Sequence, residues 1–455
     1  MGNRKVLIAN RGEIACRIMH SCRQLGVSTV AVFSEADREA MHVQLADEAV
    51  FVGAAPARES YLRVDAILDA ARRTGANAVH PGYGFLSENA DFAAAVQDAG
   101  LIWIGPAPAC IAAMGDKERA RQIADAAGVP VLPGSRRFEP HDLDGLEEEA
   151  RRLEYPLLVK AAAGGGGIGM RRVDRESDLH QAVQATQSMA AKAFGDGSVY
   201  LEHYVSSARH VEVQVFGYGD GSGVHLFDRD CSVQRRFQKV VEEAPAPGIP
   251  GEVRDVLYRS ALSLVRAQKY SGAGTVEFVF DRHRERAWFL EMNTRIQVEH
   301  PVTELITGID LVGWQLEQAF GSLQRVPQEA IRASGHAVEC RLYAERPEKG
   351  FLPSPGPLEE LRWPEESDGL RIDTGVREGD RVTPYYDPMI AKLAAWGVDR
   401  SAAIHRLERA LAELKLSGLR TNAEFLRRVL GDDDFLQSRV DTGLAMAVLE
   451  RYVTR

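Results

Sequence analysis

The chain has 455 residues, of which 45% are hydrophobic and 26% are charged, which is ordinary for a globular protein. Its formal net charge of -10 argues against nucleic acid or an anionic membrane as the main partner, because both require basic surfaces. No apolar run approaches the ~20 residues of a membrane span, no signal peptide is recognisable, and the five cysteines form no CxxC pair, so we expect a cytoplasmic protein.

The amino-terminal part alternates between short apolar runs and amphipathic segments. Strands are predicted near residues 5–9, 28–33, 77–82 and 101–105, and helices near residues 12–26, 61–75 and 88–100. Gly26 and Gly75 end two of these helices. Strands that alternate with helices predict a doubly wound parallel sheet covered on both faces, and we place this α/β domain at residues 1–113.

The pattern changes beyond residue 198. Partly alternating segments predict antiparallel strands near residues 199–205, 210–218, 223–228, 274–281 and 287–293. Further strands with Pro/Gly turns begin near residue 337 and precede an amphipathic helix at residues 401–414. These patterns predict a central α+β domain at residues 114–336 and a mixed α/β domain at residues 337–455.

A glycine-rich segment, "KAAAGGGGIGM", occupies residues 160–170. Consecutive glycines let backbone N–H groups approach an anion closely, and a phosphate is the commonest such anion. The segment matches neither the Walker A motif nor the Rossmann fingerprint. A flexible linker is the alternative, but the flanking "PLLVKA" and "MRRV" resemble two hairpin strands. The segment therefore predicts a mobile phosphate-binding flap, with Lys160 supplied by the preceding strand.

A second cluster of polar residues lies in "WFLEMNTRIQVEHPVTE", at residues 288–304. If this segment stays extended, one face presents Glu291, Asn293, Arg295, Gln297 and Glu299. A solvated edge strand is the alternative, but the opposite face is apolar and amides are unusual among solvent-facing charges. Convergent polar groups near a phosphate loop favour a catalytic site.

Glu277, in "GTVEFVF", offers a second carboxylate on a neighbouring strand. A strand glutamate that faces solvent is the alternative, but Glu277, Glu291 and Asn293 together form an oxygen-ligand set that suits Mg²⁺. The planar guanidinium of Arg295 suits a small oxyanion, and Glu299 could serve that anion as a general base. The pattern predicts an ATP-driven step on a carboxylate-like or carbonate-like substrate.

Many motifs, in one order along the chain, resemble those of biotin carboxylase, the ATP-grasp component of the biotin-dependent carboxylases. They include "IANRGEIA", "HPGYGFLSEN", "MGDK", "RHVEVQV", "EMNTRIQVEHPVTE", "ECRLYAE" and "PYYDPMIAKL". The resemblance extends over essentially the whole chain. It implies an ATP-grasp fold for residues 114–336, with a glycine-rich lid at about residues 131–204.

The resemblance also implies a reaction, in which ATP activates bicarbonate to carboxyphosphate and the carboxyl group moves to biotin on a carrier protein. Mg²⁺ or Mn²⁺ would be held by Glu277, Glu291 and Asn293. Nucleotide contacts are implied for Lys117, Lys160, Gly165, Gly166, Glu202, His210 and Gln234. Bicarbonate contacts are implied for Lys239, Arg295, Gln297 and the Val298 backbone. The implied base is Glu299, and Arg341 is implied to stabilise the biotin enolate.

Three residues depart from the family pattern: Ile168, in place of Arg or Lys in the flap, Phe237, in place of His in "QRRHQK", and His203, in place of Lys in the hinge. Ile168 and Phe237 remove donors near the nucleotide, so altered ATP affinity is expected. The flap resembles that of urea-carboxylase-like members, which leaves the final acceptor open between an acyl-CoA, such as acetyl-CoA in fatty acid biosynthesis, and a urea-type molecule.

No "MKM" biotinylation site is present, so the carrier and the carboxyltransferase are expected either on other chains or outside the given sequence; a homodimer is also expected from the family. Two alternatives remain open. A different ATP-grasp ligase would share the flap and the metal site without needing Arg341. A catalytically silent ATP-binding subunit would account for the departures at Ile168 and Phe237.

Overall fold

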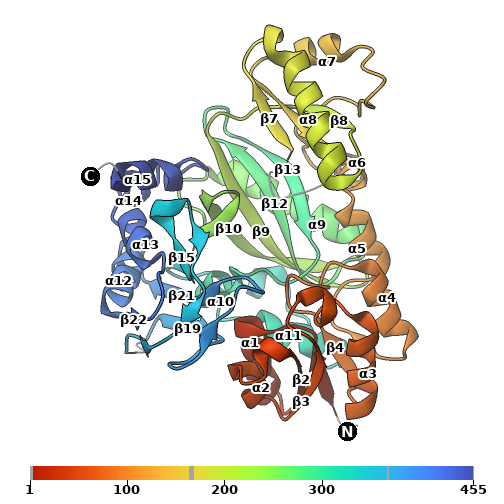
Figure 1. Cartoon of the computed structure of the whole chain (residues 1–455). Coiled ribbons are helices and arrows are strands. Elements are labelled where there is room, and N and C mark those ends of the chain that lie inside the picture. Colours follow the sequence, from red (N-terminus) through yellow and green to blue (C-terminus); the bar gives the residue numbers. More distant parts are fainter. Residues whose placement is uncertain (1–3, 163–168, 366–367, 454–455) are drawn as a thin grey trace.

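The computed structural model describes residues 4–162, 169–365 and 368–453, and Figure 1 shows their arrangement. The amino-terminal region contains a five-stranded parallel sheet in the order β3-β2-β1-β4-β5. Its strands are β1 (Lys5–Ile8), β2 (Ser28–Ser34), β3 (Glu48–Gly53), β4 (Ala78–His80) and β5 (Ile102–Trp103). Its helices are α1 (Gly12–Gln24), α2 (Met41–Leu45), α3 (Val64–Thr74), α4 (Ala90–Asp98) and α5 (Pro108–Gly115). The predicted doubly wound sheet is confirmed; β3, α2 and α5 were not predicted.

Side-chain alternation along β1 explains why helices cover both faces of this sheet. Val6 and Ile8 pack in the same core cluster as residues of α1, whereas Leu7 packs with residues of α3 and α4 on the other face. The strand order reverses between β1 and β4, which places the loops that follow these two strands side by side. This reversal creates a crevice at the carboxyl ends of β1 and β4.

An eight-stranded antiparallel sheet forms the centre of the molecule, in the order β13-β12-β9-β10-β11-β14-β21-β19. Its strands are β9 (Ala208–Tyr218), β10 (Gly223–Arg235), β11 (Gln238–Ala244), β12 (Ser271–Asp281), β13 (Arg286–Asn293), β14 (His336–Tyr343), β19 (Leu370–Thr374) and β21 (Met389–Gly397). Neighbouring helices are α6 (Lys117–Ala126), α9 (Gly251–Ala267), α10 (His300–Thr307) and α11 (Leu311–Ala319). The predicted boundary at residue 336 lies at the start of β14, which pairs with β11, and this domain division stays a prediction.

A smaller unit projects from the central sheet at the upper end of Figure 1. Its three-stranded antiparallel sheet contains β6 (Leu157–Ala161), β7 (Met170–Val173) and β8 (Val199–His203), in the order β7-β6-β8. Helices α7 (Leu146–Leu153) and α8 (Leu179–Phe194) pack against these strands. The predicted pairing of the two strands that flank the glycine segment is confirmed. Gly165, Gly166 and Ile168 themselves lie outside the described residues.

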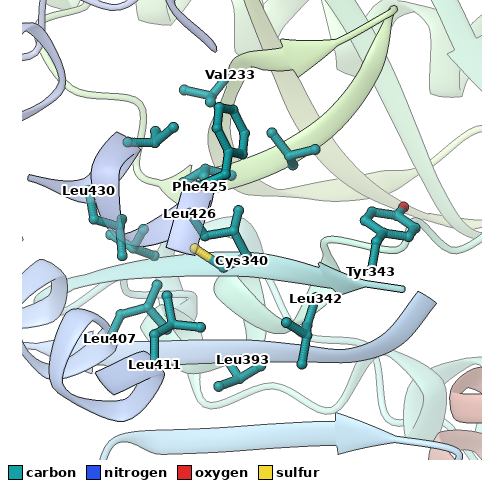
Figure 2. Close-up of a cluster of buried hydrophobic side chains, with 14 of the residues drawn as sticks. Val233, Cys340, Leu342, Tyr343, Leu393, Leu407, Leu411, Phe425, Leu426 and Leu430 are labelled. Carbon is teal, nitrogen blue, oxygen red and sulfur yellow. The ribbon is translucent and has the colours of Figure 1, made fainter. Parts of the chain in front are cut away.

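The carboxy-terminal part packs helices on the end of the central sheet. These are α12 (Arg400–Glu413), α13 (Ala423–Leu430), α14 (Asp433–Leu436) and α15 (Leu444–Val453). Short strands complete this region: β15 (Glu345–Arg346), β16 (Leu352–Pro353), β17 (Gly356–Pro357), β18 (Glu360–Arg362), β20 (Arg381–Val382) and β22 (Lys415–Ser417). Figure 2 shows Cys340, Leu393, Leu407 and Phe425 in one apolar cluster that also contains Val233 of β10. Within the described ranges, no helix is both long and apolar enough to cross a membrane.

Candidate active site

Lys239, on β11, lies at the centre of a buried cluster of carboxylates. Its Nζ atom lies 2.6 Å from Glu212 Oε2, 2.8 Å from Glu277 Oε1 and 2.6 Å from Glu299 Oε1. Burial alone would lower the pKa of Lys239, but the three carboxylates raise it well above its ordinary value. Lys239 is therefore a fixed positive charge, brought together with Glu212 and Glu277 by strands β9, β11 and β12 and with Glu299 by the turn before α10.

Glu299 is fully buried at the start of α10 and is held at both oxygens. Lys239 donates to Oε1, and Nη2 of Arg341 donates to Oε2 at 2.9 Å. Burial would raise the pKa of this carboxyl, but Lys239, Arg341 and Arg229 hold it well below its usual range. Arg341 is itself fixed, because its Nε donates to Glu242 Oε1 at 2.6 Å. Both sequence-predicted groups are thus brought to one point from β14 and α10.

The predicted metal ligands lie on the adjacent strands β12 and β13. Glu277 and Glu291 are direct cross-strand partners, and Asn293 Nδ2 donates to Glu277 Oε1 at 2.9 Å. Burial and the neighbouring Glu277 raise the pKa of Glu291, whose carboxylate has no hydrogen bond or ion pair to any other described residue. Two crowded carboxylates fit a hard divalent cation such as Mg²⁺, which would relieve their repulsion, whereas the Asn293 amide oxygen faces Arg295 in this structure.

The segment after Asn293 does not remain extended. Strand β13 ends at Asn293, and a turn leads into α10, so the expected uninterrupted strand face is wrong. The side chains still converge, because Arg295 donates to Gln297 Oε1 at 2.9 Å and to Asn293 Oδ1 at 3.1 Å. Gln297 in turn donates to Glu277 Oε1 at 3.2 Å. Hydrogen bonding therefore replaces strand geometry as the cause of the convergence.

Backbone amides add to the positive character of this corner. Val298 and Glu299 precede α10, where helix N–H groups carry partial positive charge. Among the described residues, the amide N–H groups of Val298 and Glu299 donate no hydrogen bond. Free amides beside Lys239 and Arg295 form a suitable environment for a small oxyanion.

The predicted nucleotide contacts fall into two groups. Lys160 on β6 pairs with Glu202 on β8, whereas His210 and Gln234 belong to the Lys239 cluster. His210 Nε2 lies 2.8 Å from Glu277 Oε2, and although burial lowers the pKa of His210, Glu277 raises it above its ordinary value. Lys117 lies at the start of α6 and lines a cavity of about 710 Å³ with residues of the smaller unit, including Tyr200.

A second cavity, of about 500 Å³, opens where the parallel sheet meets the central sheet. Arg295, Val298 and Arg341 line one side of it. Tyr83, Tyr343, Tyr385 and Tyr386 line the remainder, together with loop residues that follow β1 and β4. The cavity therefore occupies the crevice at which the strand order reverses, the usual ligand position in open α/β sheets. A ligand there would contact the same Arg341 that holds Glu299.

Comparison with known proteins decides the family. Three family descriptions match: "Biotin carboxylase, N-terminal domain" at residues 2–111, "Carbamoyl-phosphate synthase L chain, ATP binding domain" at residues 116–325 and "Biotin carboxylase C-terminal domain" at residues 339–446. The biotin carboxylase of Pseudomonas aeruginosa is 47% identical over 96% of this chain and 96% of that protein. The chain belongs to the biotin carboxylase family.

Two further relatives extend the comparison. The alpha subunit of mitochondrial methylcrotonoyl-CoA carboxylase from Oryza sativa subsp. japonica is 50% identical over 98% of this chain, which spans only 60% of that relative's length. The biotin carboxylase domain dimer of Hydrogenobacter thermophilus 2-oxoglutarate carboxylase was solved with MgADP, ADP and bicarbonate. It is 42% identical, with a TM-score of 0.92 over 98% of each chain.

Two departures from the biotin carboxylase pattern are visible in the fold. Phe237 is 62% exposed at the tip of the turn between β10 and β11. His203, at the end of β8, has Nδ1 3.2 Å from the carbonyl oxygen of Leu153 and Nε2 3.3 Å from Arg284 Nη1. Both residues are therefore placed by local contacts or exposure rather than by the carboxylate cluster.

Sequence reasoning missed several residues that hold the site together. Glu212 is fully buried and accepts from both Lys239 and Arg229, each at 2.6 Å. The sequence could have indicated Glu212, because it lies two residues after His210 and alternate residues of a strand share one face. Glu88, which accepts from Arg295 Nε at 2.9 Å, gave no such signal, since it lies 207 residues away in sequence.

Proposed function

We propose that the chain catalyses the ATP-dependent carboxylation of biotin on a carrier protein, with bicarbonate as the carboxyl source. The observation that carries this proposal is the position of Glu299. Its carboxylate is buried between Lys239 and Arg341, and both Arg341 and Val298, the residue before Glu299, line the tyrosine-lined cavity. Glu299 can thus act on a small anion, while the Arg341 that holds it faces a larger substrate in the cavity.

In the first step, bicarbonate would bind to Lys239, Arg295, Gln297 and the Val298 amide. Glu299 would accept the bicarbonate proton, and the resulting oxygen would attack the γ-phosphorus of ATP, which releases ADP and forms carboxyphosphate. Mg²⁺ held by Glu277, Glu291 and Asn293 would neutralise charge on the phosphates. Lys117, Lys160, Glu202, His210 and Gln234 are the proposed nucleotide contacts, with Gly165 and Gly166 outside the described residues.

In the second step, the carboxyl group would pass to N1′ of biotin, with release of phosphate. Biotin would enter the cavity of about 500 Å³, where Arg341 lies. The released phosphate would accept the N1′ proton, which places negative charge on the ureido oxygen, and the Arg341 guanidinium would stabilise that charge. Because Arg341 also holds Glu299, the two steps would share one cation.

We further propose a carrier protein and a carboxyltransferase as partners, and a homodimer as the assembly. The 50% identity to methylcrotonoyl-CoA carboxylase alpha subunits favours a branched acyl-CoA as the final acceptor over acetyl-CoA or a urea-type molecule. The cytoplasmic location stays a prediction.

The decisive experiment measures ATP hydrolysis by the purified chain with Mg²⁺, with and without bicarbonate and free biotin. We expect hydrolysis that depends on bicarbonate and increases with biotin. Hydrolysis indifferent to bicarbonate would favour another ATP-grasp ligase, and ATP binding without hydrolysis would favour a silent subunit. Omission of Mg²⁺ should abolish hydrolysis, since Glu277 and Glu291 would then face the phosphates without a cation.

A further inference from the structure

A buried lysine outside the proposed catalytic set contacts the anion-binding turn from behind. Lys392 lies on β21, and its side chain is fully buried. Its Nζ atom donates to the carbonyl oxygen of Val298 at 2.8 Å. Cross-strand pairing explains this position, because Arg341 of β14, Lys392 of β21 and Asp373 of β19 are direct neighbours across the sheet. Adjacent strands thus direct two cations to the consecutive residues 298 and 299.

The contacts of Lys392 indicate that its role is not ion pairing alone. Its carboxylate neighbours are farther away than the Val298 carbonyl, with Glu13 at 3.3 Å and Asp373 at 3.6 Å. Asp373 already accepts from Arg371 at 2.8 Å, and Glu13 accepts from the Tyr83 hydroxyl. Both carboxylates therefore keep another partner without Lys392. The shortest contact of a fully buried ammonium is with a neutral backbone carbonyl.

His300 holds the preceding carbonyl in the same turn. Its Nδ1 lies 2.7 Å from the carbonyl oxygen of Gln297, and its side chain is fully buried. A carbonyl oxygen can only accept, so Nδ1 carries the proton. Burial and the nearby Lys392 lower the pKa of His300 well below its ordinary value, which leaves the ring neutral. Consecutive carbonyls, at residues 297 and 298, are thus each fixed by a buried side chain.

Peptide planarity transmits this restraint to the anion. In a trans peptide, the carbonyl of one residue and the N–H of the next point in opposite directions. Because the Gln297 carbonyl points toward the His300 side chain, the Val298 N–H points away from it. Because the Val298 carbonyl points toward Lys392, the Glu299 N–H points away from Lys392. Both amides lack an acceptor among the described residues, and Val298 lines the substrate cavity. We propose that Lys392 and His300 are positioning residues that aim these two amides at the bicarbonate anion.

This inference rests on the proposed function, and bicarbonate-dependent ATP hydrolysis without biotin tests it. Lys392→Met removes the donor to the Val298 carbonyl. His300→Leu removes the short side-chain donor to the Gln297 carbonyl, which keeps only the His300 backbone N–H at 3.4 Å, so the amides are held less firmly. We expect the KM for bicarbonate to rise at least about tenfold, since a misaligned amide no longer makes its hydrogen bond to the charged bicarbonate. The KM for ATP should change by less than about twofold, because the nucleotide contacts are untouched.

Two matched variants separate positioning from stability. His300→Asn keeps an N–H near the position of Nδ1 and should restore the KM for bicarbonate. Lys392→Met/Glu13→Gln removes a buried negative charge together with the positive one. Relative to Lys392→Met, this double variant should regain melting temperature, but its KM for bicarbonate should stay high. If Lys392→Met does not fold, the His300→Leu and His300→Asn pair decides.

The two proposals fail in distinguishable ways. An unchanged KM for bicarbonate in folded His300→Leu, or an equal rise in both KM values, would overturn the positioning role while the proposed function stands. Hydrolysis by the unchanged chain that ignores bicarbonate would overturn the proposed function and this inference with it.

Discussion

At the scale of single residues, the site is a compact set of buried charges that neutralise one another. Lys239 contacts three carboxylates, and Arg229 and Arg341 supply further positive charge to Glu212 and Glu299. Removing one member of such a cluster leaves its partner buried and uncompensated. The function of one residue is therefore best tested with a substitution that preserves its shape. The control is the same substitution in a buried ion pair outside the site.

Glu299→Gln tests the proposed base. The amide cannot accept the bicarbonate proton, so bicarbonate-dependent hydrolysis should fall at least about 100-fold while ATP affinity is retained. Glu243→Gln is the matched control, because Glu243 is equally buried on β11 and pairs with Arg400 at 2.6 Å and His336 at 2.8 Å. Turnover by Glu299→Gln that equals that of the control would contradict the assignment of the base.

The raised pKa of Glu345 predicts a measurable pH dependence of the free energy of unfolding. Burial raises its pKa from 4.5 to about 7, against the opposing effect of Arg235, whose Nε donates at 2.9 Å. A carboxyl whose pKa is higher when folded holds its proton more tightly in the folded state. This contribution to stability is complete below about pH 4.5 and is lost as the pH rises through about 7.

Glu345→Gln removes this titration, since an amide does not ionise. The melting temperature of the unchanged chain, relative to that of Glu345→Gln, should therefore decrease between about pH 5 and about pH 8. A difference that is constant, or that increases with pH, would show that Arg235 stabilises the ionised form more than burial destabilises it.

At the scale of elements, local sequence patterns predicted contacts between segments that are close in sequence. They missed contacts that arise from the pairing of distant strands. Alternation placed Glu277 and Glu291 on neighbouring strands, and the glycine segment lies between two paired strands as expected. The side-by-side positions of Arg341 and Lys392 follow from register between distant strands, which no local window encodes. Strand β3 was missed because its burial is irregular, with Phe51 47% exposed.

The turn between β10 and β11 carries backbone strain. Its two residues, Arg236 and Phe237, have φ values of 47° and 65°. A two-residue hairpin with both φ values positive is normally Asn-Gly, and other residues cost about 1–2 kcal/mol each in this conformation. Arg236→Asn/Phe237→Gly should relieve most of this strain, and the added unfolded-chain entropy of glycine offsets part of the gain. The free energy of unfolding should therefore rise by about 1–2 kcal/mol, which thermal denaturation would detect.

Val398→Gly is the control for this turn. Val398 is also exposed and apolar, but it does not have a positive φ, so glycine there should destabilise through added entropy of the unfolded chain. A double turn variant that is no more stable than the unchanged chain would show that contacts of Arg236 or Phe237 offset the strain.

At the scale of the whole molecule, the central sheet joins segments that the sequence assigned to different domains. Strand β14 pairs with β11, and one apolar cluster contains Val233 and Val241 together with Leu342, Leu393 and residues of α12. Arg341 and Lys392 reach the active site only through this continuous sheet. The carboxy-terminal part therefore completes both the core and the proposed anion site.

A chain that ends at residue 335 tests this unity. It would lack β14, β19 and β21, so the edge of β11 and the apolar residues Val233, Val240 and Val241 would be exposed. An uncovered apolar edge strand promotes association, and we expect the fragment to aggregate under conditions in which the full chain does not. The fragment would also lack Arg341, which holds Glu299. A soluble, monomeric fragment with bicarbonate-dependent hydrolysis would show that the central region folds and acts independently of the strands that follow it.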